Sequence, residues 1–570
     1  MATPADTRPS TVVDISALGG RRKARSHPKG HPVDPQARRD IAELLGDAPR
    51  RRDLLIEFLH RIQDRYGCVS AAHILALAEE LRLARTEVYE VATFYHHFDV
   101  VTEGEAPPPP ITVRVCETLS CQMAGAEALL AACVQAQWPG VRVIAAPCIG
   151  RCEQAPAAVV GRNAIGNASI ERIAHQVMSK GLEAALPEAI GYAGYRSAGG
   201  YRTLQACVRG EHSIDGIVAV LEASGLRGLG GAGFPAGRKW KIVRAEPAPR
   251  LLAVNIDEGE PGTFKDRYYL ERDPHRFLEG MLIAAWAVGI DDVYVYLRDE
   301  YAGCRALLER ELAALQRDPP CALPRIHLRR GAGAYICGEE SAMIESIEGK
   351  RGMPRLRPPY VAQVGLFGRP TLEHNMETLF WIRDIVEKGG TWFAGQGRNG
   401  RKGLRSFSVS GRVARPGVHL APAGITVREL IDEFCGGMAP GHEFYAYLPG
   451  GASGGILPAS LGDVPLDFDT LQPYGCFIGS AAVIILSKHD RARDAALNLM
   501  RFFADESCGQ CTPCRVGTEK AVAMMKVPRW DTALLGELSQ AMGDASICGL
   551  GQAAPNPIAC VVKYFPEELL

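Results

Sequence analysis

The hydrophobic and polar positions in the first third of the chain change their period twice. Between residues 36 and 100, apolar residues recur at three- and four-residue spacing, which predicts a small unit of amphipathic helices. The PPPP run at 107–110 ends that unit, because proline breaks helices. After it, ITVRVC alternates like a strand, AGAEALLAACVQA has a helical pattern, and VRVIAAPC returns to a strand. This order predicts a small α/β domain that ends near residue 180.

The rest of the chain continues the alternation of helical and strand patterns. The Gly- and Tyr-rich stretch AIGYAGYRSAGGYR is typical of a connector, and a second α/β region follows it. LRSFSVSGRVARPGVHL and AAVIILS bracket a smaller unit with strand character, and helices follow from HDRARDAALNLMRFFADES onward. The predicted boundaries are a disordered basic tail at 1–35, a helical unit at 36–106, an α/β domain at 107–182, a linker at 183–202, a second α/β domain at 203–402, a strand-rich unit at 403–486 and a helical unit at 487–570.

Composition and charge narrow the class of protein. A chain of 570 residues with 47% hydrophobic residues is too long for one core and has enough apolar content for several. Its 64 Lys and Arg balance 65 Asp and Glu, so no global field favours nucleic acid. No apolar run approaches the ~18 residues that span a bilayer, and the first 30 residues lack the apolar segment of a signal peptide. We therefore expect a soluble, cytoplasmic protein with no nucleic-acid or membrane partner, and a solvated tail in preference to a docking segment.

Four cysteines follow the two strands of the small α/β domain. Cys116 and Cys121 form C-x4-C at the end of the first strand, and Cys148 and Cys152 form C-x3-C after the second. Because equivalent strand ends lie at one edge of a sheet, both loops can present thiolates to one metal centre. Such wide loops suit a 2Fe-2S cluster, whereas zinc prefers C-x2-C knuckles. Zinc and four unrelated core cysteines stay as alternatives.

A second group of cysteines lies near the C-terminus in ESCGQCTPCRVGT. Cys508, Cys511 and Cys514 form C-x2-C-x2-C, a spacing that fits three corners of a 4Fe-4S cubane, with zinc as the minor alternative. The fourth ligand must come from elsewhere, and Cys548 in SICGLGQ is the candidate. Most cysteines outside both groups are isolated in sequence and predicted to be structural: Cys68, Cys133, Cys207, Cys304, Cys321, Cys435, Cys476 and Cys560. Cys337 lies in GAGAYICGEES, and its spacing offers no partner thiol.

Two stretches of the second α/β domain have the character of a ligand site. SGLRGLGGAGFPAGRKW (224–240) satisfies G-x-G-x-x-G, but it follows a helical pattern where the dinucleotide fingerprint requires a strand. Its bare backbone can still approach a phosphate or a planar ring, or it is a flexible interdomain turn. LLAVNIDEGEPGTFKDR (251–267) ends a strand with several acids, which either accept hydrogen bonds from ribose and ribityl hydroxyls or form a solvated turn.

Longer stretches resemble known families. VYEVATFYHHF, CETLSC and CIGRCEQAPAAVV resemble the thioredoxin-like 2Fe-2S subunit of respiratory complex I over roughly residues 36–180. The two stretches above, with GAGAYICGEES and RPPYVAQVGLFGRPTLEHNMETLFW, resemble its NADH-oxidising FMN subunit, beginning near residue 200 and continuing to the end. The resemblance implies a multidomain α/β fold with a helical unit, a thioredoxin-like 2Fe-2S domain, a Rossmann-like FMN/NAD domain, a β-grasp domain and a C-terminal helical bundle with a 4Fe-4S cluster.

The resemblance also implies roles for single residues. Cys116, Cys121, Cys148 and Cys152 would hold the 2Fe-2S cluster, and Cys508, Cys511, Cys514 and Cys548 the 4Fe-4S cluster. For FMN and NAD it implies a cleft of Gly228, Gly230, Gly231 and Lys239, a flavin edge of Asn255, Asp257, Glu258 and Gly259, a wall of Tyr335, Gly338, Glu339 and Glu340, and a phosphate end of Asn375 and Thr378. Phe234 and Tyr360 match positions that stack on NADH, and Arg357 matches a basic one. His374 is either a phosphate donor or a packed loop residue.

The acids suggest a preference between the two nicotinamide cofactors. A carboxylate near the adenosine ribose accepts hydrogen bonds from free hydroxyls and repels a 2'-phosphate. We therefore expect Glu260 and Glu340, placed near the nicotinamide or ribose, to favour NAD over NADP.

These cofactors together imply an NAD-dependent oxidoreductase. Nicotinamide exchanges two electrons as hydride and an iron-sulfur cluster exchanges one, and FMN converts between them, so no catalytic acid or nucleophile is expected. LLIEFLHRIQDRYG, HHFDVV, RGLGGAGFP and FADESCGQCTPCR resemble the beta (diaphorase) subunit of NAD-dependent molybdenum or tungsten formate dehydrogenase. That resemblance implies a separate alpha subunit that carries further iron-sulfur clusters. The alternatives are the diaphorase of an NAD-reducing hydrogenase, a complex I module, and an electron-transfer scaffold with a vestigial nucleotide site.

Overall fold

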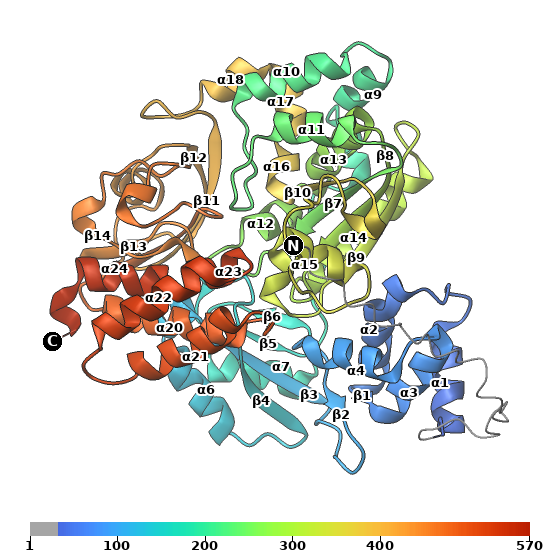
Figure 1. The fold of residues 1–570 in the computed structure, drawn as a ribbon, viewed down its shortest axis with the longest axis horizontal. Coiled ribbons are helices and arrows are strands. Elements are labelled where there is room, and N and C mark those ends of the chain that lie inside the picture. The colour runs from blue at the N-terminus through green and yellow to red at the C-terminus, as the bar shows by residue number, and fades with distance from the viewer. Residues whose placement is uncertain (1–31, 570) are drawn as a thin grey trace, which may run out of the picture.

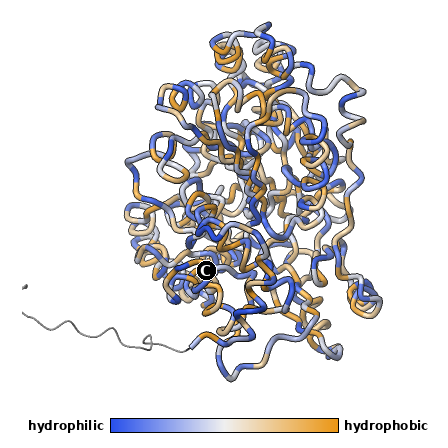
Figure 2. Tube along the Cα trace, turned by 90° about the vertical axis from the view of Figure 1, so that its right-hand side faces the viewer, coloured by the Kyte–Doolittle hydropathy of each residue, from blue (hydrophilic) through white to orange (hydrophobic). Residues whose placement is uncertain are grey.

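The computed structural model describes residues 32–569, and Figure 1 shows their arrangement. The predicted tail therefore lies outside the described residues except for its last four, 32–35. Figure 2 shows hydrophobic and hydrophilic positions alternating along the chain. The small α/β domain has its own hydrophobic core, whereas the buried hydrophobic residues of the other units join in one larger cluster.

The N-terminal unit is helical, as its period predicts. Asp34 caps the first helix by accepting hydrogen bonds from the backbone N–H groups of Gln36 and Ala37, and Gly67 ends the second in the left-handed conformation. The elements are α1 (Pro35–Leu45), η2 (Arg52–Leu54), α2 (Leu55–Tyr66), β1 (Val69–Ser70), α3 (Ala71–Leu81), α4 (Arg85–Phe94) and β2 (Val100–Val101).

The next domain has a four-stranded sheet in the order β4-β3-β5-β6. Strands β3 and β4 are parallel, with Cys116 opposite Ala146, so the loops that leave these two strands emerge at the same edge. The elements are β3 (Ile111–Cys116), α5 (Leu119–Met123), α6 (Ala126–Gln135), β4 (Val141–Ala146), η3 (Cys152–Gln154), β5 (Ala158–Val160), β6 (Asn163–Ile165) and α7 (Ile170–Ser179).

The stretch expected as a linker at 183–202 is partly helical and firmly attached. The hydroxyl of Tyr195 donates to Glu279 Oε2 at 2.6 Å, and the backbone N–H of Tyr201 donates to the same oxygen at 2.8 Å. Both tyrosines are buried against the next domain. A Gly-rich sequence can therefore be held in place by its aromatic residues, here in α8 (Tyr192–Ser197) and before α9 (Arg202–Val208).

The second α/β domain is built on a fully parallel sheet in the order β10-β7-β8-β9. Helices cover both faces, so β7 and β8 are almost continuously apolar. The elements are α10 (Ile214–Ser224), α11 (Ala236–Ala245), β7 (Arg250–Ile256), α12 (Lys265–Leu270), α13 (Pro274–Val288), β8 (Ile290–Leu297), α14 (Ala302–Arg317), β9 (Arg325–Arg330), η4 (Tyr335–Gly338), α15 (Glu340–Ile347), η5 (Leu366–Gly368), β10 (Thr371–Asn375), α16 (Met376–Phe380), α17 (Ile382–Lys388) and α18 (Gly390–Ala394).

The strand-rich unit has a mixed five-stranded sheet in the order β12-β11-β15-β13-β14. Strands β11 and β15 are parallel, and the other neighbours are antiparallel. The elements are β11 (Leu404–Gly411), β12 (Gly417–Pro422), α19 (Val427–Glu429), η6 (Leu430–Phe434), β13 (Phe444–Leu448), η7 (Ala452–Gly454), β14 (Leu457–Pro458), η8 (Ala459–Leu461), η9 (Gln472–Tyr474) and β15 (Ala482–Ser487).

The C-terminal unit consists of helices that pack against the units before it (Figure 1, red). The side chain of Asn498 donates to the backbone oxygen of Glu117 at 2.9 Å, directly after the first cluster strand. The elements are α20 (Ala492–Asp505), α21 (Thr512–Met525), α22 (Thr532–Ala545), α23 (Gly549–Ala553), α24 (Asn556–Tyr564) and η10 (Pro566–Leu569).

Candidate cofactor and cluster sites

The structure brings the four N-terminal cysteines together in a buried group. Cys148 Sγ lies 3.4 Å from Cys152 Sγ. Hydrogen bonds with the thiols of Cys121 and Cys148 raise the pKa of Cys116, so the two sequence pairs are in direct contact. Four buried cysteine sulfurs on two loops form the donor set that a 2Fe-2S cluster requires, and they fit that group.

Two buried arginines attach these cluster loops to the second α/β domain. Arg298, which follows β8, donates to the backbone oxygens of Cys148 and Glu258, each at 2.6 Å. Arg267 in α12 donates from Nε to the backbone oxygen of Gly150 at 2.8 Å. Each guanidinium satisfies carbonyls that have no strand partner, and Arg298 thereby joins the cluster loop to the acidic strand end.

The acidic strand end is buried at Asp257 and half-buried at Glu258 and Glu260, so it is not a solvated turn. The carboxylate of Glu258 accepts hydrogen bonds from the backbone N–H groups of Asp266 (2.7 Å) and Arg267 (3.1 Å) and from the hydroxyl of Tyr301 (2.8 Å). Desolvation, with the nearby charge of Asp266, raises the pKa of Glu258 to about 7. Burial also raises the pKa of Asp257 well above its usual range. This placement agrees with a ligand site.

The ends of β7 and β10 meet in register beside the Gly-rich loop. Asn255 lies opposite Asn375, and the Asn375 amide donates to Asp266 Oδ2 at 2.7 Å while its oxygen accepts from Lys265 Nζ at 3.2 Å. A methyl group added at Gly230 would lie 2.9 Å from the Cβ of Asn375. Only glycine can pass the strand end so closely, which leaves the bare backbone cradle that a flavin phosphate needs.

Side chains from later elements fix the Gly-rich loop. The hydroxyl of Thr378 accepts a hydrogen bond from the backbone N–H of Leu229 at 2.9 Å. Lys239 Nζ donates to the backbone oxygen of Glu373 at 2.9 Å and to its carboxylate at 3.2 Å. The loop follows helix α10, so the departure from the dinucleotide fingerprint that the sequence predicts is present in the fold.

His374 is buried against a tryptophan. Its Nε2 accepts a hydrogen bond from Trp240 Nε1 at 2.8 Å, and burial lowers the pKa of His374 well below its usual range. The ring is therefore a neutral acceptor, which agrees with the packed alternative, and contact with phosphate stays a prediction.

The predicted opposite wall closes over the strand end. The Asn255 amide donates to the backbone oxygen of Gly338 at 2.9 Å, and Glu339 caps helix α15. Arg357 forms ion pairs with Glu339 and with Glu340, the latter at 3.0 Å. Of the two aromatic residues predicted to stack on NADH, Phe234 is 38% and Tyr360 55% exposed, so both remain accessible to a ligand.

Glu260 is held by a residue that the sequence did not single out. Ser453 donates to Glu260 Oε1 from its backbone N–H at 2.8 Å and from its hydroxyl at 2.7 Å, and the hydroxyl of Tyr335 donates to the other oxygen. Ser453 lies in the Gly-rich stretch 449–460, within η7 of the strand-rich unit. No spacing signal could reveal this contact, because Ser453 and Glu260 are 193 residues apart.

The C-terminal cysteines converge as their spacing predicts. Cys508, Cys511, Cys514 and Cys548 line one small hollow, to which Ile336 of the opposite wall also contributes. The hollow therefore lies against the wall formed by Tyr335 and its neighbours. Four cysteine sulfurs around one hollow fit a 4Fe-4S cluster.

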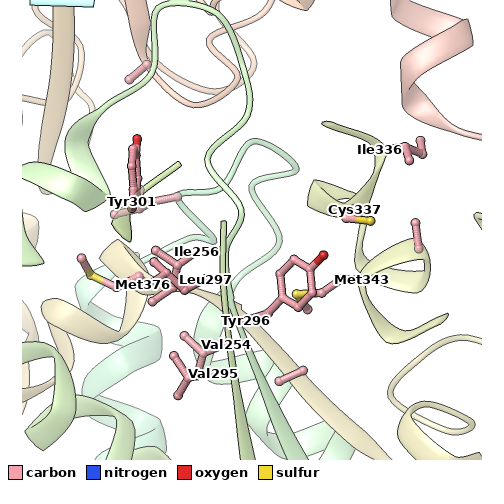
Figure 3. Packing of buried hydrophobic residues seen from close by; sticks show 14 of the residues in the cluster. Val254, Ile256, Val295, Tyr296, Leu297, Tyr301, Ile336, Cys337, Met343 and Met376 are labelled. Carbon is pink, nitrogen blue, oxygen red and sulfur yellow. The ribbon is translucent and has the colours of Figure 1, made fainter. Parts of the chain in front are cut away.

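The packing beneath the wall is apolar. Figure 3 shows Ile256 and Leu297 at the ends of β7 and β8, with Tyr296 turned toward Cys337 and Met343. Cys337 is fully buried, and burial raises its pKa, so it is an inert part of this core.

Within residues 32–569, no helix carries an apolar stretch long enough to cross a membrane.

Four segments match families of known domains. Residues 41–180 match the thioredoxin-like [2Fe-2S] ferredoxin family, and residues 221–384 the Nuo51 FMN-binding domain. Residues 406–457 match the SLBB domain, and residues 494–570 the NADH-ubiquinone oxidoreductase-F iron-sulfur binding region. The predicted fold class and the cofactors FMN, NAD(H), 2Fe-2S and 4Fe-4S are thereby confirmed at the level of the domain families.

Relatives that match about two thirds of the chain, and one solved structure that matches most of it, agree with these domains. The chain is 40% identical over 391 residues to an NADH-quinone oxidoreductase subunit of Rhizobium meliloti, which covers 66% of this chain and 93% of the relative. It is 40% identical over 392 residues to the mitochondrial NADH-ubiquinone oxidoreductase 51 kDa subunit of Neurospora crassa, 65% of this chain and 78% of that one. Among solved structures, a chain of an NAD+-reducing [NiFe]-hydrogenase in the H2-reduced state superimposes with a TM-score of 0.79 at 31% identity, over 91% of this chain and 92% of the other.

Proposed function

Because the chain belongs to the family of the 51 kDa subunit of NADH-ubiquinone oxidoreductase and carries a thioredoxin-like [2Fe-2S] domain in the same polypeptide, we propose that it is the NAD-reducing subunit of a formate dehydrogenase complex. Its activity as an NADH-oxidising or NAD-reducing diaphorase module follows from the family. We further propose that formate is the electron donor. It would be oxidised on a separate molybdenum or tungsten subunit that carries its own iron-sulfur clusters.

The convergence of the predicted site residues supports the diaphorase chemistry. The Gly-rich loop, the ends of β7 and β10, and the wall from Tyr335 to Glu340 enclose one region, and the hollow of the C-terminal cysteines shares Ile336 with that wall. When bound, FMN exchanges hydride with nicotinamide and single electrons with iron-sulfur clusters. The adjacency of a nucleotide cradle and a four-cysteine hollow is the single observation that carries the diaphorase function.

We assign the work of the chain to positioning and to exclusion of water. Thr378 and Lys239 fix the loop and the strand edge that would hold the FMN phosphate end, and Asn255 fixes the wall across from them. The buried Asp257 and the half-buried Glu258 present acceptors to ribityl hydroxyls, and Phe234 and Tyr360 offer faces to the nucleotide rings. No residue has to act as a catalytic acid or as a nucleophile toward the substrate.

Formate as donor is supported by the retained cysteines and by stretches such as LLIEFLHRIQDRYG and FADESCGQCTPCR. Diaphorases of NAD-reducing hydrogenases resemble this chain but commonly lose ligands of the N-terminal cluster, whereas Cys116, Cys121, Cys148 and Cys152 are all present. A hydrogenase diaphorase or a complex I module is the second candidate, favoured by the likeness of the whole chain to the NAD+-reducing hydrogenase structure. We propose a cytoplasmic location with the complex.

The test uses the assembly that co-purifies with the full chain. NAD+ reduction is measured with formate and, separately, with hydrogen; formate-dependent reduction is expected, and hydrogen-dependent reduction alone would refute the donor. Cys548→Ser should abolish electron flow to NAD+, while Cys435→Ser, a buried cysteine of the strand-rich unit, should not. If the FMN-loaded chain does not reduce viologen with NADH, the chain is an electron-transfer scaffold.

A further inference from the structure

Two cysteines that are isolated in sequence lie side by side in the fold. Cys476 follows η9 in the strand-rich unit, and Cys560 lies in α24 of the C-terminal unit. Their sulfurs are 3.5 Å apart, and each residue is 2% exposed. The prediction that both are single structural cysteines is therefore wrong in one respect, because they form a pair. We propose that Cys476 and Cys560 form a reversible disulfide that joins the strand-rich unit to the cluster-bearing helices.

The space around the two sulfurs is shaped for them. Gly455 lies beneath the pair with φ +83°, and a methyl group there would come within 2.5 Å of Cys476 Sγ and 3.0 Å of Cys560 Sγ. Any other residue would push the sulfurs apart. A disulfide needs sulfurs about 2.0 Å apart, so the two sulfurs, now 3.5 Å apart, have to approach by about 1.5 Å.

The surroundings favour ionisation within the pair. The hydrogen bond between the two sulfurs lowers the pKa of Cys560 and raises that of Cys476, and the Lys563 ammonium, three residues beyond Cys560, acts to lower the pKa of both. One thiol of the pair is therefore the nucleophile and the other the resolving thiol.

The oxidant is a peroxide, which is small enough to reach a buried sulfur. One thiolate of the pair attacks one oxygen of hydrogen peroxide, an S–O bond forms, the O–O bond breaks, and the leaving hydroxide takes a proton to become water. The other thiol then attacks the sulfenic sulfur, so that the S–S bond forms and the S–O bond breaks with release of a second water. The two thiols lose two electrons and two protons, and a dithiol reductant reverses the change.

The bond would act on the site through α24. Asn556, in the first turn of that helix, donates from its amide to the backbone oxygen of Ser453 at 2.9 Å. Ser453 in turn holds Glu260 through its backbone N–H and its hydroxyl. A covalent link between Cys560 and Cys476 therefore restrains the loop that positions Glu260, whichever donor complex the chain serves.

The test treats the full-length chain with stoichiometric hydrogen peroxide without oxygen, quenches it in acid with N-ethylmaleimide, and maps the peptides by mass spectrometry. A peptide pair joined through Cys476 and Cys560, about two mass units lighter than the free thiols because two hydrogens are lost, is expected, and dithiothreitol should remove it. Cys435→Ser, at another buried thiol, should leave the link unchanged, and Cys476→Ser should abolish it.

The mapping of the unmodified chain keeps the test decisive if a variant fails to fold. Quantitative labelling of both cysteines after peroxide treatment would overturn the proposal, as would a link from either one to a different cysteine. Thermal unfolding adds a second measurement, since the linked form should unfold several degrees higher than the reduced form. An unchanged midpoint of thermal unfolding in a fully linked sample would show that the disulfide does not restrain the two units.

Discussion

Replacing Arg298 tests the attachment of the 2Fe-2S domain to the flavin domain. Its guanidinium is 5% exposed and donates to two backbone oxygens, those of Cys148 and Glu258, each at 2.6 Å, and it pairs with Glu300 at 3.1 Å. Arg298→Gln cannot reach all three groups. It leaves buried acceptors unpaired at about 1–3 kcal/mol each, so we expect a loss of roughly 3–5 kcal/mol.

The assay follows heat-induced loss of the 2Fe-2S absorbance together with far-UV circular dichroism. At about 2–4 °C per kcal/mol for domains of this size, the midpoint should fall by roughly 6–20 °C. Arg298→Lys keeps the charge but not the forked geometry, so its midpoint should lie between those of the wild type and the Gln variant. Arg310→Gln, at a half-exposed arginine in α14, is the matched control and should change little. Equal midpoints for the variants at 298 and at 310 would show that Arg298 does not anchor the cluster loop.

Three further predictions concern the acids of the site. Glu340→Gln removes the proposed repulsion of a 2'-phosphate, so the ratio of kcat/KM for NADH over NADPH should fall about tenfold, equivalent to about 1.4 kcal/mol; an unchanged ratio would sink the selectivity role. Ser453→Ala deletes the 2.7 Å hydrogen bond to Glu260, and KM for NADH should rise about five- to tenfold while the 4Fe-4S signal stays; Ser453→Thr should restore it. The pKa of Glu258 is raised from 4.5 to about 7, so the unfolded chain ionises first and stability falls as pH rises from about 4.5 to 7. Glu258→Gln should flatten that part of the profile of unfolding temperature against pH, and an unchanged slope would contradict it.

The sequence could predict what depends on local spacing. The C-x2-C-x2-C motif, the cysteines at two strand ends and the failed dinucleotide fingerprint all concern residues near one another in the chain, and parallel strands bring their ends to one edge. The helical period likewise predicts the N-terminal unit.

Contacts between distant segments could not be predicted in this way. Arg298 reaches a carbonyl 150 residues away, Ser453 reaches Glu260 across 193 residues, and Cys476 meets Cys560 across 84. Each of these residues looks ordinary in its local sequence, since Arg, Ser and Cys are common in loops and cores. The attachment of the connector before the flavin domain could not be predicted for a related reason: the burial of its tyrosines depends on Glu279 in a later helix.

This chain is expected above all to carry electrons between NAD(H) and an iron-sulfur cluster through a bound flavin. That transfer can be observed by anaerobic titration of the purified, FMN-loaded full-length chain with NADH, followed by electron paramagnetic resonance and by reduction of methyl viologen. We expect NADH to reduce the 4Fe-4S cluster and then viologen, and Cys548→Ser to lose the cluster signal while FMN remains bound. If the 4Fe-4S cluster of a chain with full FMN and cluster content stays oxidised in the presence of NADH, the proposed electron transfer is contradicted.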